Sequence, residues 1–162
     1  MRKAVFTTLL LALFLFAFAP LSQAVENGTL APDFKLPTLE GKQISLSDFK
    51  GQVIVLKLAT TWCPTCQQQS QEIGHLKDYL LAHDVAVVEV FVQDSEQMVR
   101  DYVKGMEFPH TILLDDGRAA KEYNLYLIPR LLLIDRNFKV RRDGSLMSAS
   151  ALKESIGKLL GG

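Results

Sequence analysis

The sequence predicts an α/β protein in which a mixed central sheet is flanked by helices, with an N-terminal hairpin extension. Two apolar segments rich in branched residues, 53–59 and 85–92, are typical of buried strands, and the segment between them, 63–83, has apolar residues at helical spacing. Further on, a short turn joins residues 131–134 to 138–141, which predicts an antiparallel pair. Strands that alternate with helices and end in a hairpin indicate a sandwich around a mixed sheet.

The remaining elements are short and are bounded by glycine or polar residues. In chain order the pattern predicts a hairpin over 34–46, a helical turn over 47–51, a helix over 95–104, a strand over 111–114, a helix over 118–123 and an amphipathic helix over 149–160. Their summed length suits one domain of ordinary size, with a core large enough to fold without disulfide support.

The first 24 residues have the pattern of a secretory signal peptide. A basic start is followed by an unbroken apolar run over 9–19 and by small residues just before a cleavage point after Ala24. The apolar run is shorter than the ~20 residues that a membrane-spanning helix needs, so an uncleaved membrane anchor is the weaker alternative. We therefore expect a signal peptide over 1–24, a domain over 25–162, and export to the periplasm or a similar compartment.

Composition excludes some classes of partner. Lys+Arg and Asp+Glu both number 18, so the formal net charge is +0, and loss of the basic start of the leader makes the mature chain slightly negative. This balance indicates neither nucleic acid nor an anionic membrane surface as a partner. The loops carry no signature of a particular substrate or oligomeric state.

The two cysteines of the chain, Cys63 and Cys66, stand in the stretch TTWCPTC, where a predicted strand gives way to a predicted helix. Unpaired N–H groups and the helix dipole stabilise a thiolate at a helix start, where a cysteine pKa can fall from about 8.5 to roughly 3.5–7.5. We therefore expect Cys63 to be the nucleophile. Cys66, almost one turn on, faces inward and can attack a mixed disulfide formed at Cys63. Pro64 suits the first turn of a helix.

Two other interpretations of this pair remain open. A structural disulfide across so short a loop would constrain the unfolded chain very little, so it is a poor explanation. A metal site needs further ligands, and the histidines of the chain are His75, His83 and His110. Of these, His110 is the candidate for a copper chaperone that would use both sulfurs.

A second constellation lies at Pro129, directly before the apolar strand 131–134. Proline cannot donate to a strand ladder, so it belongs at the first residue of the strand. The bond between Ile128 and Pro129 is a candidate for the cis form, although the local sequence alone favours trans.

An ordered set of motifs resembles one known family. The motifs are APDF, LSDFKG, TWCPTC and FPHTILLDDGRAAKEYNLYLIPRLLLID. Together they run from about Ala31 to the C-terminus and resemble exported thioredoxin-like thiol–disulfide oxidoreductases of the TlpA, ResA and DsbE type. The resemblance implies a thioredoxin-like fold and thiol–disulfide exchange at Cys63 and Cys66.

The resemblance also implies how substrates bind. In that fold the proline before the penultimate core strand is cis and packs against the dithiol, and the residue before it pairs with the substrate backbone. Pro129 and Ile128 stand at these positions, and we expect Trp62 and Pro64 to complete the substrate-binding surface. The implied partners are protein thiols or disulfides and a membrane-bound dithiol donor that resets the protein, with no cofactor and no metal.

Three residues depart from the family pattern. Gln69 stands where a proton-transferring glutamate is common, and Arg130 stands where a threonine usually follows the proline. Lys57 occupies the position of the buried acid of thioredoxin. Its amine either snorkels to water, which the cost of an unpaired buried ammonium favours, or lies under the dithiol and stabilises the thiolate.

The sequence therefore predicts an exported thiol–disulfide oxidoreductase that works as a reductase. One alternative is a peroxiredoxin-like thiol peroxidase, since that class shares the APDF start and the spacing of Thr60 and Cys63. Its usual proline seven residues before the cysteine is Leu56 here. The other alternative is the copper-binding chaperone.

Overall fold

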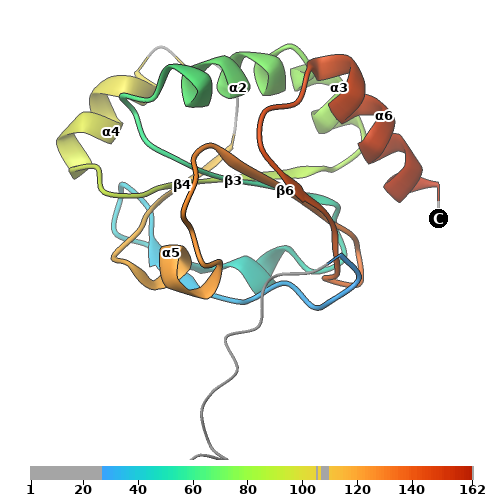
Figure 1. Ribbon diagram of the computed structural model, residues 1–162, viewed down its shortest axis with the longest axis horizontal. Coiled ribbons are helices and arrows are strands. Elements are labelled where there is room, and N and C mark those ends of the chain that lie inside the picture. Colours follow the sequence, from blue (N-terminus) through green and yellow to red (C-terminus); the bar gives the residue numbers. More distant parts are fainter. Residues whose placement is uncertain (1–26, 105, 107–109, 162) are drawn as a thin grey trace, which may run out of the picture.

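The computed structural model describes residues 27–104, 106 and 110–161. They form a sheet that is covered on both faces (Figure 1). The predicted leader, residues 1–24, lies outside the described residues. Within the described part of the chain, no helix has the length and apolar character needed to cross a membrane.

The central sheet has five strands in the order β5-β4-β3-β6-β7. The strands are β3 (Ile54–Ala59), β4 (Ala86–Phe91), β5 (Thr111–Leu114), β6 (Arg130–Ile134) and β7 (Val140–Gly144). The pairs β3–β4 and β4–β5 are parallel, whereas β3–β6 and β6–β7 are antiparallel. The mixed sheet with a terminal hairpin is thus confirmed. A separate N-terminal hairpin, β1 (Lys35–Pro37) with β2 (Gln43–Ser45), is also confirmed.

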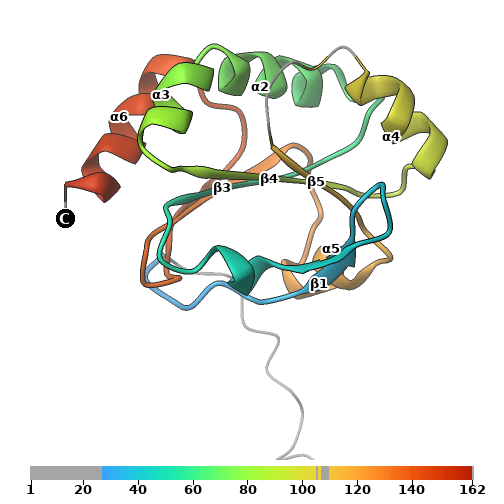
Figure 2. The ribbon, with the colours of Figure 1, turned by 180° about the vertical axis from the view of Figure 1, so that it is seen from behind.

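Helices cover the two faces of the sheet unequally. Figures 1 and 2 show one face under α2 (Pro64–Gly74), α3 (Lys77–Ala82), α4 (Glu96–Val103) and α6 (Ala149–Leu160). The other face is covered by α5 (Arg118–Glu122), the β1–β2 hairpin and the 3-10 helix η2 (Leu46–Phe49). A central strand between two such layers is buried on both sides, which is why β3 and β4 are almost wholly apolar.

Side chains of β3 alternate between these layers. Val55 belongs to the apolar cluster under α2, α3 and α6, whereas Leu56 and Leu58 belong to the cluster on the side of α5 and the hairpin. Successive side chains of a strand point to opposite faces, so Lys57 lies on the same face as Val55. The fold therefore places a lysine directly under the helix that carries the cysteines.

The prediction of one continuous helix over 63–83 is wrong. The structure has two helices, α2 and α3, with a break at residues 75 and 76. Gly74 ends α2, and glycine is a poor helix former because it has the largest backbone entropy to lose. Ile73 before the break, Leu76 in it and Leu80 after it all pack into the same core cluster, so the apolar faces of both helices stay on the sheet.

Candidate active site

Cys63 is the N-cap residue of α2, with extended backbone angles and Pro64 in the first turn. Its Sγ accepts a hydrogen bond from the backbone N–H of Cys66 at 3.3 Å and lies 3.2 Å from the hydroxyl of Thr65. Burial alone would raise the pKa of Cys63, but the hydrogen bonds from Cys66 and Thr65 outweigh burial, so the pKa lies below its ordinary value. The lowered pKa increases the fraction of this sulfur that is present as thiolate, in the direction that the helix-start position predicts.

Cys66 has a different environment. It is 0% exposed, whereas Cys63 is 7% exposed. Burial and the hydrogen bond with Cys63 raise the pKa of Cys66 to about 12, against smaller lowering effects of the Thr60 backbone and the Lys57 charge. The two sulfurs thus face one another but differ in acidity and access, so one suits attack on an external disulfide and the other suits a later internal step.

The second predicted constellation lies against the first. The Ile128–Pro129 peptide bond is cis, as the resemblance implies and contrary to the form that the local sequence favours. Ile128 packs against the small cluster formed by Ala59, Cys63 and Cys66. Residues 65 positions apart in the sequence are thereby brought to one place, because β6 runs beside β3 in the sheet.

The other predicted substrate-binding residues lie at the surface. Trp62 is 59% exposed, and Pro64 is also exposed. Trp62 follows a well-anchored loop, since Asp94 accepts hydrogen bonds from the backbone N–H and the hydroxyl of Thr61, and Gln67 donates to the Thr61 carbonyl. Asp94 and Gln67 were missed by sequence reasoning, because neither has a spacing that ties it to the cysteines.

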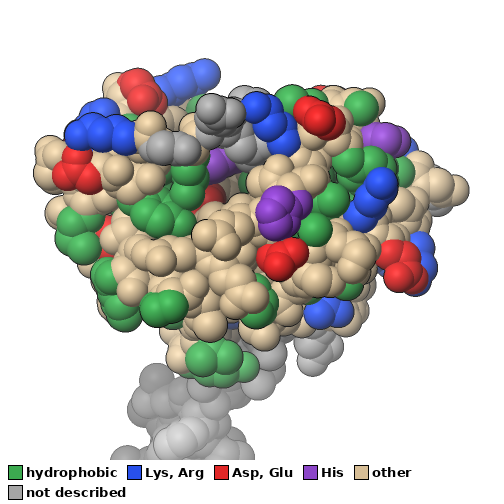
Figure 3. All heavy atoms as spheres, turned by 90° about the horizontal axis from the view of Figure 1, so that it is seen from above, with side chains coloured by type: hydrophobic (Ala, Val, Ile, Leu, Met, Phe, Trp, Pro, Cys, Tyr) green, Lys and Arg blue, Asp and Glu red, His purple; other side chains and the backbone are tan. Residues whose placement is uncertain are grey.

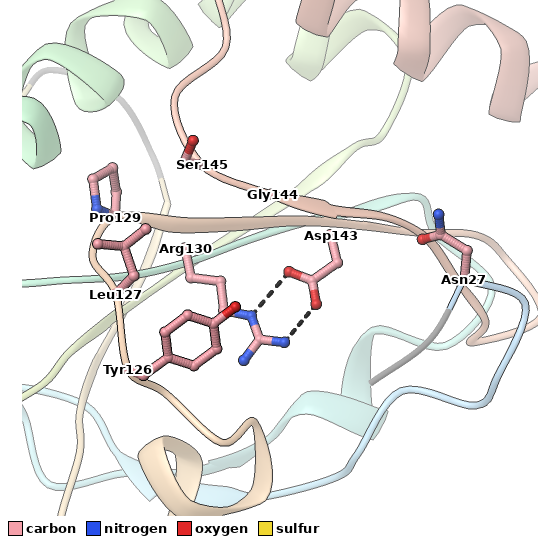
Figure 4. A pocket seen from close by; sticks show the side chains of 8 residues that line it. All are labelled: Asn27, Tyr126, Leu127, Pro129, Arg130, Asp143, Gly144 and Ser145. Carbon is pink, nitrogen blue, oxygen red and sulfur yellow. Dashed lines mark hydrogen bonds and ion pairs between the residues drawn. The ribbon is translucent and has the colours of Figure 1, made fainter. Parts of the chain in front are cut away.

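A pocket of about 450 Å³ opens beside Pro129 (Figure 4). Its walls come from the loop before β6, with Tyr126 and Leu127, and from the end of β7, with Ser145. Arg130 and Asp143 also line the pocket, with their side chains pointing toward one another.

The ion pair between Arg130 and Asp143 gives a structural role to Arg130, which departs from the family pattern. Arg130 donates to both carboxylate oxygens of Asp143, at 2.9 Å and 2.5 Å, and also donates to the Tyr123 carbonyl. The hydrogen bond from Asp143 raises the pKa of Arg130. A bidentate pair of this kind fixes orientation as well as distance. Arg130 therefore ties the loop that ends in Pro129 to β7.

The snorkelling interpretation of Lys57 is wrong, and the interpretation that buries it under the dithiol is correct about its location but missed its partner. Its side chain is 0% exposed, so it does not snorkel, and its ammonium is not an unpaired cation. The Nζ atom lies 2.5 Å from the Glu89 carboxylate and 2.5 Å from the Ser70 hydroxyl. Glu89 is directly opposite Lys57 in the β3–β4 register, so both charges point to the same side of the sheet. Pairing removes most of the cost of burial that argued for snorkelling.

Gln69, the third departure, is fully buried and holds the loop before α6. Its amide oxygen accepts from the Met147 N–H at 2.6 Å, and its amide nitrogen donates to the Met147 carbonyl at 3.2 Å. One turn on, Glu72 accepts from the backbone N–H of Ala149 in the first turn of α6. An ionised glutamate could not donate to a carbonyl, so the amide is the group that satisfies both backbone atoms.

The histidines considered as metal ligands are dispersed. His75 and His83 are exposed at the ends of α2 and α3, and His110 lies 3.5 Å from Glu89. Within the described residues, no group of three or more His, Cys, Asp and Glu side chains is placed to hold a metal ion.

A five-stranded mixed sheet with two facing cysteines at a helix start and a cis-proline beside them defines a thioredoxin-like thiol–disulfide oxidoreductase. The Redoxin family model matches residues 26–150, and the chain belongs to that family.

Individual relatives agree with this assignment. The chain is 31% identical over 161 residues to the sporulation thiol-disulfide oxidoreductase A of Bacillus subtilis, covering 95% of this chain and 97% of the relative. It is 29% identical over 122 residues to the thiol-disulfide oxidoreductase ResA of Bacillus thuringiensis subsp. konkukian, covering 75% and 70%. A Chlorobium tepidum structure assigned as a thiol:disulfide interchange protein DsbE matches with a TM-score of 0.77 and 27% identity, covering 85% of this chain and 100% of that one. The predicted TlpA, ResA and DsbE type is confirmed.

The Gln69→Glu variant tests the role of the buried amide. A carboxylate there leaves the Met147 carbonyl without a donor, so we expect a loss of about 1–3 kcal/mol in the free energy of unfolding at neutral pH. Burial favours the protonated acid, so the folded-state pKa is raised. The variant should be closest to wild type below the ordinary glutamate pKa and lose stability as the pH rises through the raised value.

Urea unfolding of both proteins across a pH series measures this difference. Gln68→Glu, at an exposed position of the same helix, is the matched control and should leave stability nearly unchanged. Equal stability of Gln69→Glu and wild type at every pH would contradict the assigned role.

Proposed function

We propose that the chain is an exported thiol–disulfide oxidoreductase that reduces disulfides of protein substrates through Cys63 and Cys66. The observation that carries this proposal is the asymmetry of the two sulfurs. Cys63 accepts from the Cys66 N–H at the helix start and has a lowered pKa, whereas Cys66 is sealed and has a raised pKa. A nucleophile and a resolving thiol need these two environments.

The proposed reaction has two exchange steps. The Cys63 thiolate attacks one sulfur of a substrate disulfide, the substrate S–S bond breaks, and the second substrate sulfur leaves as a thiolate that takes a proton. A mixed disulfide now joins Cys63 to the substrate. Cys66 loses its proton and attacks the Cys63 sulfur, which releases the remaining substrate thiolate. Two electrons have passed to the substrate, and the Cys63–Cys66 disulfide awaits reduction by a membrane-bound dithiol donor.

The surface around the cysteines suits an extended substrate segment. In the proposal Ile128 pairs with the substrate backbone beside Pro129, and exposed Trp62, Tyr126 and Leu127 supply apolar contact. On the helical face, charges of both signs are scattered rather than gathered into one patch (Figure 3). Backbone pairing with apolar contact would accept many sequences, as a general reductase requires.

The electrostatics under the dithiol support a reductase. A bare cation near Cys63 would stabilise its thiolate and make the disulfide more oxidising. Here the Lys57 charge is neutralised by Glu89, and the groups that set the pKa of Cys63 are burial and its hydrogen bonds with Cys66 and Thr65. The buried cation is therefore compensated by its own partner and gives little reason to expect an oxidant.

Trapping variants test the two cysteine roles. With Cys66→Ser, the Cys63 thiolate remains but the resolving thiol is gone, so a mixed disulfide with a denatured disulfide-containing protein such as insulin should accumulate. With Cys63→Ser, no mixed disulfide should form, and reduction should fall to the background rate. Non-reducing electrophoresis measures both outcomes, and wild-type activity in Cys63→Ser would refute the assignment.

The reduction potential of the Cys63–Cys66 couple tests the direction. We expect a value nearer to the about −270 mV of thioredoxin than to the about −120 mV of the strong oxidant DsbA, because no net positive charge lies under the dithiol. Equilibration against glutathione or dithiothreitol buffers, read by thiol alkylation, gives the value. A potential close to that of DsbA would mean that the protein works as an oxidant.

Export is tested on the full chain produced in a bacterium with a secretory pathway. The mature protein should appear in the periplasm or medium with an N-terminal sequence beginning VENGTL, because cleavage follows Ala24. N-terminal sequencing and intact mass distinguish this product from the uncleaved chain. Uncleaved protein in the membrane fraction would instead support the anchored alternative.

A further inference from the structure

Trp62 is a large apolar side chain that the fold leaves in solvent directly before the dithiol. It is 59% exposed, whereas its neighbours Thr61 and Cys63 are 8% and 7% exposed. An indole ring gains free energy when it packs onto apolar surface, so a ring that stays out needs a backbone that holds it there. In the proposed function Trp62 contacts the substrate, and the residue that holds this backbone therefore bears on substrate binding.

Thr61, the residue before Trp62, is bonded through all of its polar groups. Its backbone N–H donates to one carboxylate oxygen of Asp94 at 2.8 Å, and its hydroxyl donates to the other at 2.9 Å. Its carbonyl accepts from the side-chain amide of Gln67 at 2.8 Å. Asp94 lies between β4 and α4, and Gln67 lies on α2, so the loop before the dithiol is held from two other parts of the fold.

The topology of the sheet brings Asp94 to this loop. The strands β3 and β4 are parallel, and their last paired residues are Ala59 and Phe91. The N–H of Val92 then donates to the Ala59 carbonyl at 2.9 Å, so the two chains are still side by side as they leave the sheet. Because the carboxyl ends of parallel strands meet at the same edge, Thr61 and Asp94 follow their strands into the same place.

The connection that carries Asp94 has an unusual backbone. Gln93 has a φ of 59°, in the left-handed region that residues other than glycine adopt uncommonly. Such conformations persist where the surrounding contacts fix them. The N-cap of α4 is Ser95, whose hydroxyl accepts from the Met98 N–H at 3.3 Å. The Asp94 carboxylate is therefore not needed to cap the helix, and both of its oxygens bond to Thr61.

The nucleophile itself is held by other contacts. The Cys63 sulfur accepts from the Cys66 N–H and lies beside the Thr65 hydroxyl, and both partners belong to the first turn of α2. Asp94 acts on Thr61, before the helix begins. Asp94 thus bears on how Trp62 is presented more than on the acidity of the reacting sulfur. Contacts of this kind, remote from the reacting atoms, affect KM more than kcat.

We propose, on the basis of the proposed function, that Asp94 is a positioning residue for substrate binding. Its carboxylate fixes Thr61, so that the Trp62 ring is already placed for an apolar side chain next to the reacting cysteine of the substrate. A ring that is held in advance loses less conformational freedom when the substrate binds, which strengthens binding. The favoured substrates are then protein segments with an apolar or aromatic residue beside the disulfide.

Two model substrates test this proposal directly. They are short peptide homodisulfides that differ only in carrying phenylalanine or serine beside the cysteine, and chromatography of the released peptide thiol gives KM and kcat. Wild type should have the lower KM for the phenylalanine peptide. Asp94→Ala removes two hydrogen bonds to a charged group and should raise this KM about tenfold, while kcat and the KM for the serine peptide change by less than about twofold.

The emission of Trp62 gives a second readout that does not depend on turnover. Trp62 is the single tryptophan of the chain, so time-resolved fluorescence anisotropy measures the motion of this ring alone. Asp94→Ala should increase the amplitude of the fast local decay. Asp94→Asn keeps an oxygen that accepts from the Thr61 N–H and an amide that can donate to the Thr61 hydroxyl, so it should restore both the wild-type anisotropy and the wild-type KM.

Two further variants keep the test decisive. Thr61→Val removes only the hydroxyl bond and should raise the KM for the phenylalanine peptide by about threefold, which serves if Asp94→Ala does not fold. Asp101→Ala removes an exposed carboxylate of α4 and is the matched control, which should behave as wild type with both peptides. In a Trp62→Ala background, Asp94→Ala should change neither KM by more than about twofold, because the ring through which it acts is gone.

The outcomes separate this proposal from the proposed function. Equal factors of change in KM for the two peptides would overturn the role of Asp94, since that is a general structural effect. A further loss of discrimination on adding Asp94→Ala to Trp62→Ala would also overturn it. Both results would leave exchange at the cysteines intact. Failure of the wild-type protein to reduce either peptide would instead overturn the proposed function, and with it the role in substrate binding given to Asp94.

Discussion

The candidate site depends on one contact, the hydrogen bond from the Cys66 N–H to the Cys63 sulfur at the start of α2. That contact exists because β3 delivers the chain to the helix start and Pro64 begins the helix without needing a partner for its nitrogen. Burial raises the pKa of the Cys63 sulfur, but the side-chain hydrogen bonds with Cys66 and Thr65, together with this backbone contact, lower it by a larger amount, whereas burial raises the pKa of Cys66. Ile128, which precedes the cis bond to Pro129, packs against the cluster that contains both cysteines.

The buried pair under the dithiol shows how a sheet tolerates charge in its core. Lys57 and Glu89 are each the fourth residue of a buried strand, and the parallel register sets them side by side. Removing either one would leave an isolated buried charge, which costs far more than the pair contributes. The two charges therefore stabilise one another beneath the dithiol helix. Ser70, Tyr102 and His110 continue this polar cluster to the lining of the cavity.

Sequence reasoning reached the fold, the helix-start position of the two cysteines and the neighbourhood of Pro129 because each has a local signal: strand and helix periodicity, a helix-start dithiol, and a proline before an apolar strand. It failed for the partner of Lys57, because that partner is set by how β3 and β4 are aligned in the sheet. Lys57 was interpreted alone, although a lone glutamate stands at the matching position of the next apolar strand. A single charge of opposite sign in each of two buried strands was the signal that could have predicted this ion pair. Asp94 and the break after Gly74 had no comparable pattern.

The departures from the family pattern become consistent once register is known. The position of the buried acid of thioredoxin holds Lys57 here. An acid, Glu89, stands opposite it on the neighbouring strand and forms an ion pair with it. The acid missing at Gln69 is absent because that side chain has a structural task that needs a donor as well as an acceptor. The Glu89 carboxylate pairs with the Lys57 ammonium under the dithiol helix and lines a cavity together with Ser70. Both departures therefore follow from the partners that these side chains meet in the folded chain.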